Sequence, residues 1–91
     1  MQIFSERLKA LRKEKRLKQS EMALRLEIST RAYQNYETNV TVPLVETLIA
    51  LADFFDVSTD YLLGRSGNPE SHKKNFKKFD GALYVENIEN E

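Results

Sequence analysis

Apolar side chains recur every three or four residues along the first 64 positions, in five short stretches separated by polar or turn-forming residues. This spacing places the apolar residues of each stretch on one face of a helix, and that face must be buried. The predicted helices span about residues 5–15, 18–26, 30–37, 44–56 and 59–63. In the fourth helix the stripe expected to be buried consists of Val45, Leu48, Leu51, Ala52 and Phe55. The pattern predicts an all-α fold with a single core.

Serines precede or begin three of the predicted helices. Ser5, Ser29 and Ser58 each carry a hydroxyl that can cap the free backbone N–H groups of a first helical turn. Gly64 follows the fifth helix, at the position where a left-handed residue usually ends a helix. We therefore expect the helical domain to occupy residues 1–64.

Residues 65–91 have the composition of a linker followed by an extension. Asn68 and the proline after it could start a helix that runs to Phe79. Alternatively, Asp80 and Gly81 form the pair favoured in the turn of a two-residue hairpin. The pattern slightly favours an extended "ALYV" segment over the helix, and a disordered extension is a third alternative.

The composition indicates one small domain. Its 91 residues are 41% hydrophobic and 31% charged, near the lower limit for a self-sufficient core, so a partner subunit is expected. The chain has no cysteine, which excludes disulfides and thiolate sites. The charged start lacks an apolar signal segment, and no stretch reaches the roughly 18 apolar residues of a membrane span. We expect a cytoplasmic protein that does not interact with membranes.

Charge alternates by segment although the formal net charge is zero. Residues 1–37 hold nine basic and five acidic residues, a balance of +4, whereas residues 38–64 hold four acids and no Lys or Arg, a balance of −4. Residues 65–78 and 79–91 repeat this pattern with +4 and −4. The chain can therefore carry one basic face despite its even charge count.

The second and third predicted helices are separated by a joint too short for an antiparallel hairpin. Glu27 and Ile28 form this joint, and the small side chain of Ala23 allows a close, steep crossing. Position by position, "KQSEMALRLEISTRAYQNYE" resembles the helix-turn-helix of the Cro and lambda-repressor-like (Xre) family of DNA-binding regulators. Its other markers are "LKALRKEKRLKQ", "YE" at 36 and 37, Pro43, and "ETLIALADFFDVSTDYLLG".

The resemblance runs without a gap from about Ile3 to Gly64. It implies a compact five-helix, lambda-repressor-like DNA-binding domain with a C-terminal extension. It also implies a protein that binds double-stranded DNA and is not an enzyme.

Hydrogen-bonding side chains occupy the face of the third predicted helix opposite Tyr33 and Tyr36. The candidates for base reading are Thr30, Arg31, Gln34 and Asn35. Arginine can donate two bonds to guanine, an amide can pair with adenine, and threonine can touch a thymine methyl. Alone, a polar helix face is ordinarily a solvated surface. The match over the whole domain instead favours a reading helix in a major groove.

The resemblance also assigns contacts to the DNA backbone and a structural ion pair. The candidate backbone contacts are Gln19, Lys18, Thr38 and Asn39. Gln19 corresponds to a family position that contacts phosphate, where the N–H groups of a helix start would help. Arg12 and Glu37 match positions that pair to lock the first helix against the third.

The chain departs from the family pattern at helix ends. Arg16, Glu27 and Asn39 stand where the family commonly has glycine, so we expect left-handed backbone there at a cost of about 1 kcal/mol, less for Asn. Lys18 replaces the usual capping Ser or Thr, which removes a hydrogen-bond acceptor.

The sequence gives little support for metal binding, cofactor binding or catalysis. The single histidine, His72, lies beside two lysines with no second ligand at metal spacing. The chain lacks a phosphate-cradling glycine loop and a nucleophile paired with a base. No metal, cofactor or catalytic residue is expected.

The leading hypothesis is a repressor that acts as a homodimer on a pseudo-palindromic operator. The predicted dimer interface consists of Tyr61, Leu62 and Leu63, because a five-residue helix cannot bury three consecutive apolar side chains in one core. The rival hypothesis is a protein-interaction module or an antitoxin component. It would bind a protein partner through Leu24 and the C-terminal extension.

Overall fold

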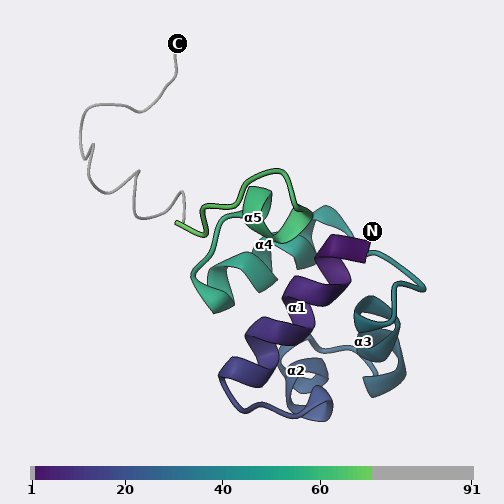
Figure 1. Cartoon of the computed structure of the whole chain (residues 1–91). Coiled ribbons are helices and arrows are strands. Elements are labelled where there is room, and N and C mark those ends of the chain that lie inside the picture. The colour runs from purple at the N-terminus through teal and green to yellow at the C-terminus, as the bar shows by residue number, and fades with distance from the viewer. Residues whose placement is uncertain (1, 71–91) are drawn as a thin grey trace.

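A computed structural model describes residues 2–70 of the chain. It contains α1 (Gln2–Glu14), α2 (Gln19–Leu26), α3 (Thr30–Glu37), α4 (Val45–Phe55) and α5 (Thr59–Leu63), as Figure 1 shows. Within these residues there is no strand, so the predicted all-α fold is confirmed. None of the described helices is long and apolar enough to cross a membrane.

The first helix starts earlier than predicted. Ser5 was expected to cap it, but α1 begins at Gln2 and Ser5 lies buried inside it. The hydroxyl of Ser5 donates a hydrogen bond to the backbone oxygen of Tyr36, at 2.9 Å. Phe4 is completely buried in the core, which holds the preceding turn in helical conformation. The predicted cap at Ser5 is therefore wrong, because tertiary burial extends the helix beyond it.

The other predicted caps are confirmed. The side chain of Ser29 accepts a hydrogen bond from the backbone N–H of Ala32 at the start of α3. Ser58 accepts one from the N–H of Tyr61 at the start of α5. Gly64 ends α5 in the left-handed region, with a φ of 81°.

Left-handed backbone also occurs at the three positions where the family commonly has glycine and this chain has another residue. The φ values are 58° at Arg16, 59° at Glu27 and 64° at Asn39. Asp56, which ends α4, has a φ of 56° that the sequence did not predict. Each places a side chain in a conformation that costs non-glycine residues on the order of 1 kcal/mol.

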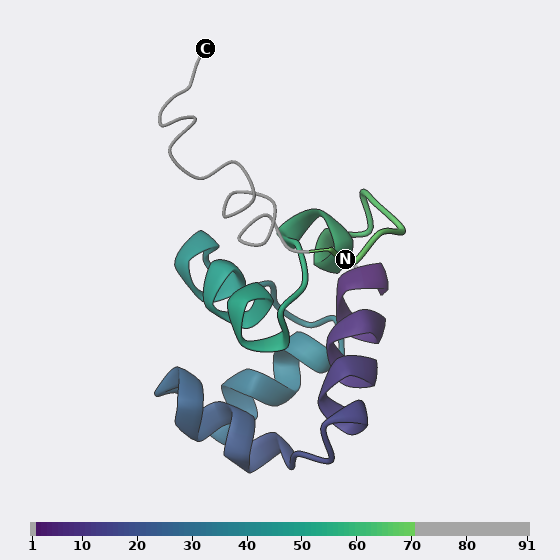
Figure 2. The same cartoon turned by 90° about the vertical axis from the view of Figure 1, so that its left-hand side faces the viewer.

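One core joins the five helices. α1 packs against α3 and α5, α2 packs against α3, and α4 packs against α5. Figure 2 shows α1 upright along one side, with α2 and α3 below and α5 above. The largest completely buried side chains are Phe4, Leu8, Met22, Tyr33, Leu51 and Leu62. Because α3 packs against both α1 and α2, its position in the domain is set by two helices.

The described chain continues to pack on the helices after Gly64. The backbone N–H of Ser58 donates to the carbonyl of Pro69 at 3.0 Å. Arg7 donates to the carbonyl of Ser66 at 2.8 Å and stacks on the Tyr61 ring, with its guanidinium carbon 4.1 Å from the ring centroid. The helix proposed to start at Asn68 is not formed over residues 68–70. The "ALYV" segment and the alternative hairpin lie outside the described residues.

Candidate nucleic-acid interface

The corner between α2 and α3 is a steep helix-turn-helix joint. Glu27 turns the chain with left-handed backbone, and the N–H of Ile28 returns to the carbonyl of Ala23 at 3.0 Å. Ala23 is only 2% exposed, so its methyl group belongs to the core beside this corner. A larger side chain would push the helices apart. The corner therefore holds α3 rigidly against α2.

The two faces of α3 differ as predicted. Tyr33 is completely buried, and its ring meets that of Tyr36 edge to face. Thr30 and Arg31 are exposed on the other face, while Gln34 and Asn35 are half-buried. The short helix thus presents polar side chains to solvent from a backbone anchored by its aromatic face.

A shallow groove of about 370 Å³ lies beside this polar face. It is lined by Gln19, Arg31, Gln34, Asn35, Thr38 and Val40. Three of the four base-reading candidates and two of the four backbone candidates therefore meet in one place. Lys18, Thr30 and Asn39 are exposed but do not line the groove. Val40, which sequence reasoning did not assign, is an apolar part of the rim.

A buried ion pair locks α1 to α3 behind the groove. Arg12 donates from Nε to Glu37 Oε2 at 2.6 Å and from Nη2 to Glu37 Oε1 at 3.0 Å. Its third donor, Nη1, reaches the carbonyl of Leu17 at 2.8 Å. This is the pair that the resemblance implied, and its two parallel bonds have the forked geometry of strong arginine–carboxylate contacts.

Tyr33 and Gln19 complete the network around Glu37. The Tyr33 hydroxyl donates to Glu37 Oε2, and Gln19 Nε2 donates to Glu37 Oε1 at 3.1 Å. Each carboxylate oxygen therefore accepts two bonds. Tyr33 was predicted only as an inward-facing aromatic residue. Its spacing of four residues from Glu37 was the signal available in the sequence.

The network sets the protonation of its members. Burial alone would raise the pKa of Glu37, but the hydrogen bonds from Arg12, Tyr33 and Gln19 outweigh it and hold that pKa below its ordinary value. Burial, and then the bond to the carboxylate, raise the pKa of Tyr33. The bond to Glu37 raises the pKa of Arg12. Glu37 is thus a carboxylate and Tyr33 a neutral donor at pH 7.

Two glutamines connect the ion pair to the groove by hydrogen bonds. Gln34 Nε2 donates to Gln19 Oε1 at 3.2 Å, and Gln19 in turn donates to Glu37. Gln19 and Gln34 were predicted separately, as a backbone contact and a base-reading residue. The structure instead couples them, so the orientation of Gln34 depends on a buried charge.

Lys18 precedes α2 without a capping side chain, because lysine has no acceptor. Glu21 compensates in part, since its carboxylate accepts the backbone N–H of Lys18 at 2.7 Å. The Lys18 side chain is exposed, at the positive end of the helix dipole.

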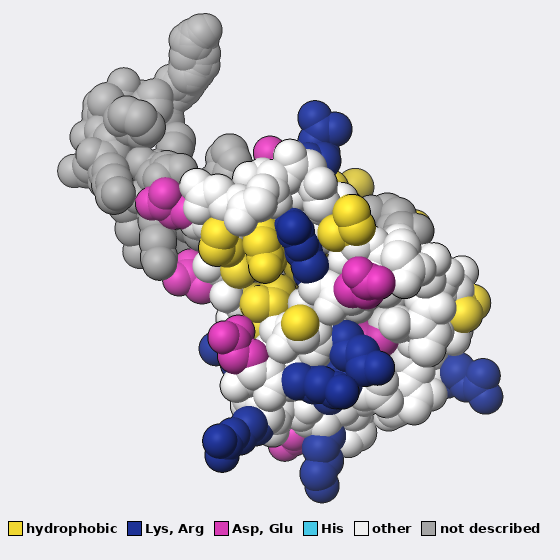
Figure 3. Space-filling model, viewed as in Figure 1, with side chains coloured by type: hydrophobic (Ala, Val, Ile, Leu, Met, Phe, Trp, Pro, Cys, Tyr) yellow, Lys and Arg dark blue, Asp and Glu magenta, His cyan; other side chains and the backbone are white. Residues whose placement is uncertain are grey.

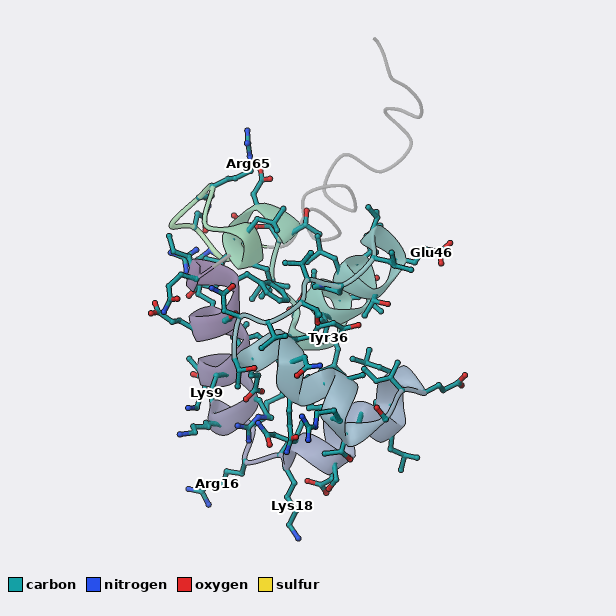
Figure 4. All side chains as sticks on the ribbon, turned by 90° about the vertical axis from the view of Figure 1, so that its right-hand side faces the viewer. Lys9, Arg16, Lys18, Tyr36, Glu46 and Arg65 are labelled. Atoms are coloured by element: carbon teal, nitrogen blue, oxygen red, sulfur yellow. The ribbon has the colours of Figure 1, made fainter. Side chains whose placement is uncertain are left out.

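Basic side chains gather around one end of the molecule. In Figure 3 most of the dark-blue side chains lie in the lower half, over the end of α1 and the turn into α2. Figure 4 shows Lys9, Arg16 and Lys18 projecting along the same end, beside α3. α4 and α5 contain no Lys or Arg. The segmental charge of the sequence has become a basic face next to the groove.

The predicted dimer residues are largely covered. Leu62 is 0% exposed and belongs to the core of its own chain, so it has no surface to offer a second copy. Arg7 covers the Tyr61 ring, and Leu63 is half-buried. Leu62 is buried because α5 packs on both α1 and α4.

Large exposed apolar side chains lie elsewhere. Within residues 2–70 they are Ile3, Leu24, Val40, Val42, Leu44, Val45 and Ile49. Val45 was expected in the buried stripe of α4, but it is 69% exposed, so that prediction is wrong. Later in the same helix Leu51 and Ala52 are buried, so the cover on α4 does not reach its first turn. The apolar period shows which face of a helix is apolar. It does not show how far along the helix other parts of the chain bury that face.

Among residues 2–70 there is no cluster of three or more side chains able to hold a metal ion. His72 lies outside these residues.

Comparison with known proteins agrees with the geometry. A helix-turn-helix family model matches residues 8–62. The HTH-type transcriptional regulator YqaE of Bacillus subtilis is 42% identical over 76 residues, which are 84% of this chain and 66% of that protein. The regulator YobD of the same organism is 34% identical over 79 residues, 85% of this chain and 70% of that protein.

A phage protein is similar over a comparable length. The cryptic phage CTXphi transcriptional repressor RstR of Vibrio cholerae is 35% identical over 70 residues, 77% of this chain and 62% of that protein. The matched regions thus make up about two thirds of these relatives. No solved structure shows a significant match. With its five helices, its steep α2–α3 corner and these relatives, the chain belongs to the Cro and lambda-repressor-like (Xre) helix-turn-helix family of DNA-binding transcriptional regulators.

Proposed function

We propose that the protein is a repressor that binds a pseudo-palindromic operator as a homodimer and blocks polymerase by occupying the site. The observation that carries this is the groove beside α3, in which five candidate DNA contacts meet. Two α3 helices about 34 Å apart would enter successive major grooves on one face of the duplex. Among the relatives, RstR is named a transcriptional repressor.

Arg31 is the side chain best suited to reading guanine. It is exposed at the start of α3, and within residues 2–70 its guanidinium forms no hydrogen bond or ion pair. All of its donors therefore remain available for the O6 and N7 acceptors of a guanine.

Gln34 is suited to adenine. It uses one N–H to bind Gln19, so its second N–H and its carbonyl oxygen are available for the paired acceptor and donor of adenine. Because Gln19 is held in turn by Glu37, the amide of Gln34 is oriented before DNA binds. This orientation reduces the entropy lost on binding. Thr30 and Asn35 complete the base-reading set.

Contacts to the DNA backbone come from the ends of the two helices. Gln19 and Lys18 lie at the start of α2, where free N–H groups and the helix dipole attract phosphate. Thr38 and Asn39 lie just after α3. These contacts set the register of α3 on the duplex without specifying sequence.

Site selection from random DNA with the purified protein tests the proposal. We expect an inverted repeat, and Arg31→Ala should weaken binding to it by about 1 to 3 kcal/mol and relax specificity at one base pair. Gln19→Ala should weaken binding to all sequences through the lost backbone contact, and should also relax the preference at the base that Gln34 reads, because Gln19 orients the Gln34 amide. Arg65→Ala is the matched control, because it removes the same charge from an exposed arginine after α5 and should have a much smaller effect.

If the Arg31→Ala variant is folded and still binds the selected site as tightly as the wild type, the assignment of the reading face is wrong. Failure to select any DNA would favour the protein-interaction reading. That reading draws on Leu24, an apolar residue that α2 leaves 78% exposed.

A further inference from the structure

Arg16 is an unfavourable residue for the turn that joins α1 to α2. Its φ of 58° lies in the left-handed region, which glycine adopts without strain and arginine does not. Its side chain is exposed, and within residues 2–70 it forms no hydrogen bond, ion pair or ring contact that would offset the strain. We propose that Arg16 binds a phosphate of duplex DNA beside the segment that α3 reads. The proposal rests on the proposed operator binding and adds to it a contact from outside the two helices of the corner.

The neighbouring charges make an unpaired arginine at this position still less favourable. Residues 13–18 hold four basic residues and only one acid, Glu14. The last turn of α1 already contains Arg12 and Lys13, which meet the preference of a helix C-terminus for positive charge. Crowded like charges destabilise a folded domain by repulsion. A phosphate bound among these side chains would remove that repulsion.

The turn holds the backbone of Arg16 in a fixed place. Its N–H donates to the carbonyl of Lys13 at 2.9 Å, and the N–H of Leu17 donates to the carbonyl of Arg12 at 3.2 Å. The carbonyl of Leu17 in turn accepts a hydrogen bond from the Arg12 guanidinium at 2.8 Å. The turn is therefore anchored both to the end of α1 and to the buried ion pair, so Arg16 projects from a rigid position.

Arg16 lies close to the start of α2, where contacts to the DNA backbone are proposed. Because an extended chain spans at most about 3.6 Å per residue, the Cα of Arg16 is within about 7 Å of that of Lys18 and about 11 Å of that of Gln19. Gln19 lines the groove beside α3. Figure 4 shows Arg16 and Lys18 projecting from the same end of the molecule, beside α3. Each DNA strand carries one phosphate per roughly 3.4 Å of its axis, so the two side chains can meet neighbouring phosphates.

The chain after α3 cannot supply this charge. Residues 38–64 contain no Lys or Arg, although Thr38 and Val40 line the groove. Neutralisation of phosphates provides most of the affinity of a protein for DNA irrespective of sequence. The cations for this must therefore come from the basic half of the chain. Arginine suits the task because its planar guanidinium can donate two parallel hydrogen bonds to a phosphate.

The salt dependence of DNA binding, measured together with urea unfolding, tests the proposal. Arg16→Gly should unfold at a higher urea concentration than the wild type, because the change removes strain and a crowded charge. It should nevertheless bind a duplex carrying the selected site more weakly. Its slope of log K against log salt should be shallower by about 0.9 for each bound copy of the chain, so the advantage of the wild type should shrink about 3.5-fold between roughly 50 and 200 mM salt. The base preferences should not change, because phosphate contacts do not read sequence.

Three variants serve as controls. Arg16→Lys keeps both the charge and the left-handed backbone, and should retain most of the wild-type slope and stability. Lys13→Ala removes an exposed cation that lines a hollow with Glu6 and Tyr61 instead of the groove beside α3, and should change the slope by less than about half as much as Arg16→Gly. Glu27→Gly relieves the same strain at a φ of 59° without removing a cation, and should stabilise the domain without weakening DNA binding.

Three results would overturn the proposal. An unchanged salt slope in Arg16→Gly would show that no phosphate contact is lost. An equal change of slope in Lys13→Ala would show that only the overall charge matters. A lower urea midpoint together with weaker binding in Arg16→Gly would assign Arg16 to the fold instead.

The same measurements separate this contact from the proposed function. A protein that selects no sequence, but binds random duplex DNA with a salt slope that depends on Arg16, would refute sequence-specific repression and leave the contact standing. A selected inverted repeat bound with the same slope by the wild type and Arg16→Gly would do the reverse. A wild type that binds no duplex at any salt concentration would refute both.

Discussion

Replacing Glu37 by glutamine tests whether the buried network stabilises the fold. The change keeps the size of the side chain but removes its charge. Each carboxylate oxygen of Glu37 accepts two donors: Oε2 from Arg12 and Tyr33, Oε1 from Arg12 and Gln19. Whichever way the new amide is turned, its NH₂ group faces donors. The variant therefore loses bonds on one side and leaves the Arg12 cation unpaired.

The expected loss is large for a domain of this size. Removing one partner of a buried ion pair costs about 3 to 5 kcal/mol. The side chain of Glu37 is 1% exposed and that of Arg12 is 10% exposed, so solvent replaces little of the lost interaction. The total free energy of unfolding of a small domain is about 5 to 15 kcal/mol. Glu37→Gln should therefore remove a substantial fraction of the stability.

Urea unfolding followed by far-UV circular dichroism measures this loss as a lower midpoint at unchanged slope. Low protein concentration keeps dimerisation from contributing to the result. Glu46→Gln is the matched control, since Glu46 is exposed and should change the free energy of unfolding by less than about 0.5 kcal/mol. In an Arg12→Met background, Glu37→Gln should cost at least about 1 kcal/mol less than alone. A cost of under about 1 kcal/mol in the wild type, or no coupling to Arg12, would refute the reasoning.

The pH dependence supplies a second readout. Because the pKa of folded Glu37 lies below its ordinary value of 4.5, its contribution is fully present above that value and is lost as pH falls through the folded pKa. The difference in stability between the wild type and Glu37→Gln should therefore shrink as the solution is acidified below about pH 5. A difference that stays constant down to pH 3 would contradict the predicted shift.

Two further predictions concern left-handed residues at helix ends, and both are measured by thermal or urea unfolding. Glu27→Gly should raise the free energy of unfolding by about 0.5 to 1 kcal/mol, because Glu27 adopts a φ of 59° that glycine accepts without strain; an unchanged or lower stability would show that its backbone is not strained. Gly64→Ala should lower the free energy of unfolding by at least about 1 kcal/mol, since φ is 81° and the new Cβ would lie 2.8 Å from Ile3 Cγ2. A variant as stable as the wild type would mean that α1 and the end of α5 adjust freely.

Signals local to the chain predicted most of the helices and their ends. Ser29 and Ser58 cap the helices they precede, and Gly64 ends the last one, because each acts on backbone groups within about four residues. Left-handed backbone at Arg16 and Glu27 followed from the family pattern, because the turns need that conformation whichever residue occupies them. The polar face of α3 was likewise visible, since helical periodicity separates Arg31 and Gln34 from Tyr33.

Only the tertiary structure decided which apolar residues are covered and which polar residues are coupled. Ser5 lies within α1 because the burial of Phe4 extends the helix, Leu62 is enclosed by other helices, and Val45 remains exposed. Periodicity assigns a residue to a face, but burial depends on how far the neighbouring helices reach along that face. The link from Glu37 through Gln19 to Gln34 joins α3 to the start of α2 across 18 and 15 residues of sequence. Such contacts exist only once the corner has set the two helices against each other, and no local pattern specifies them.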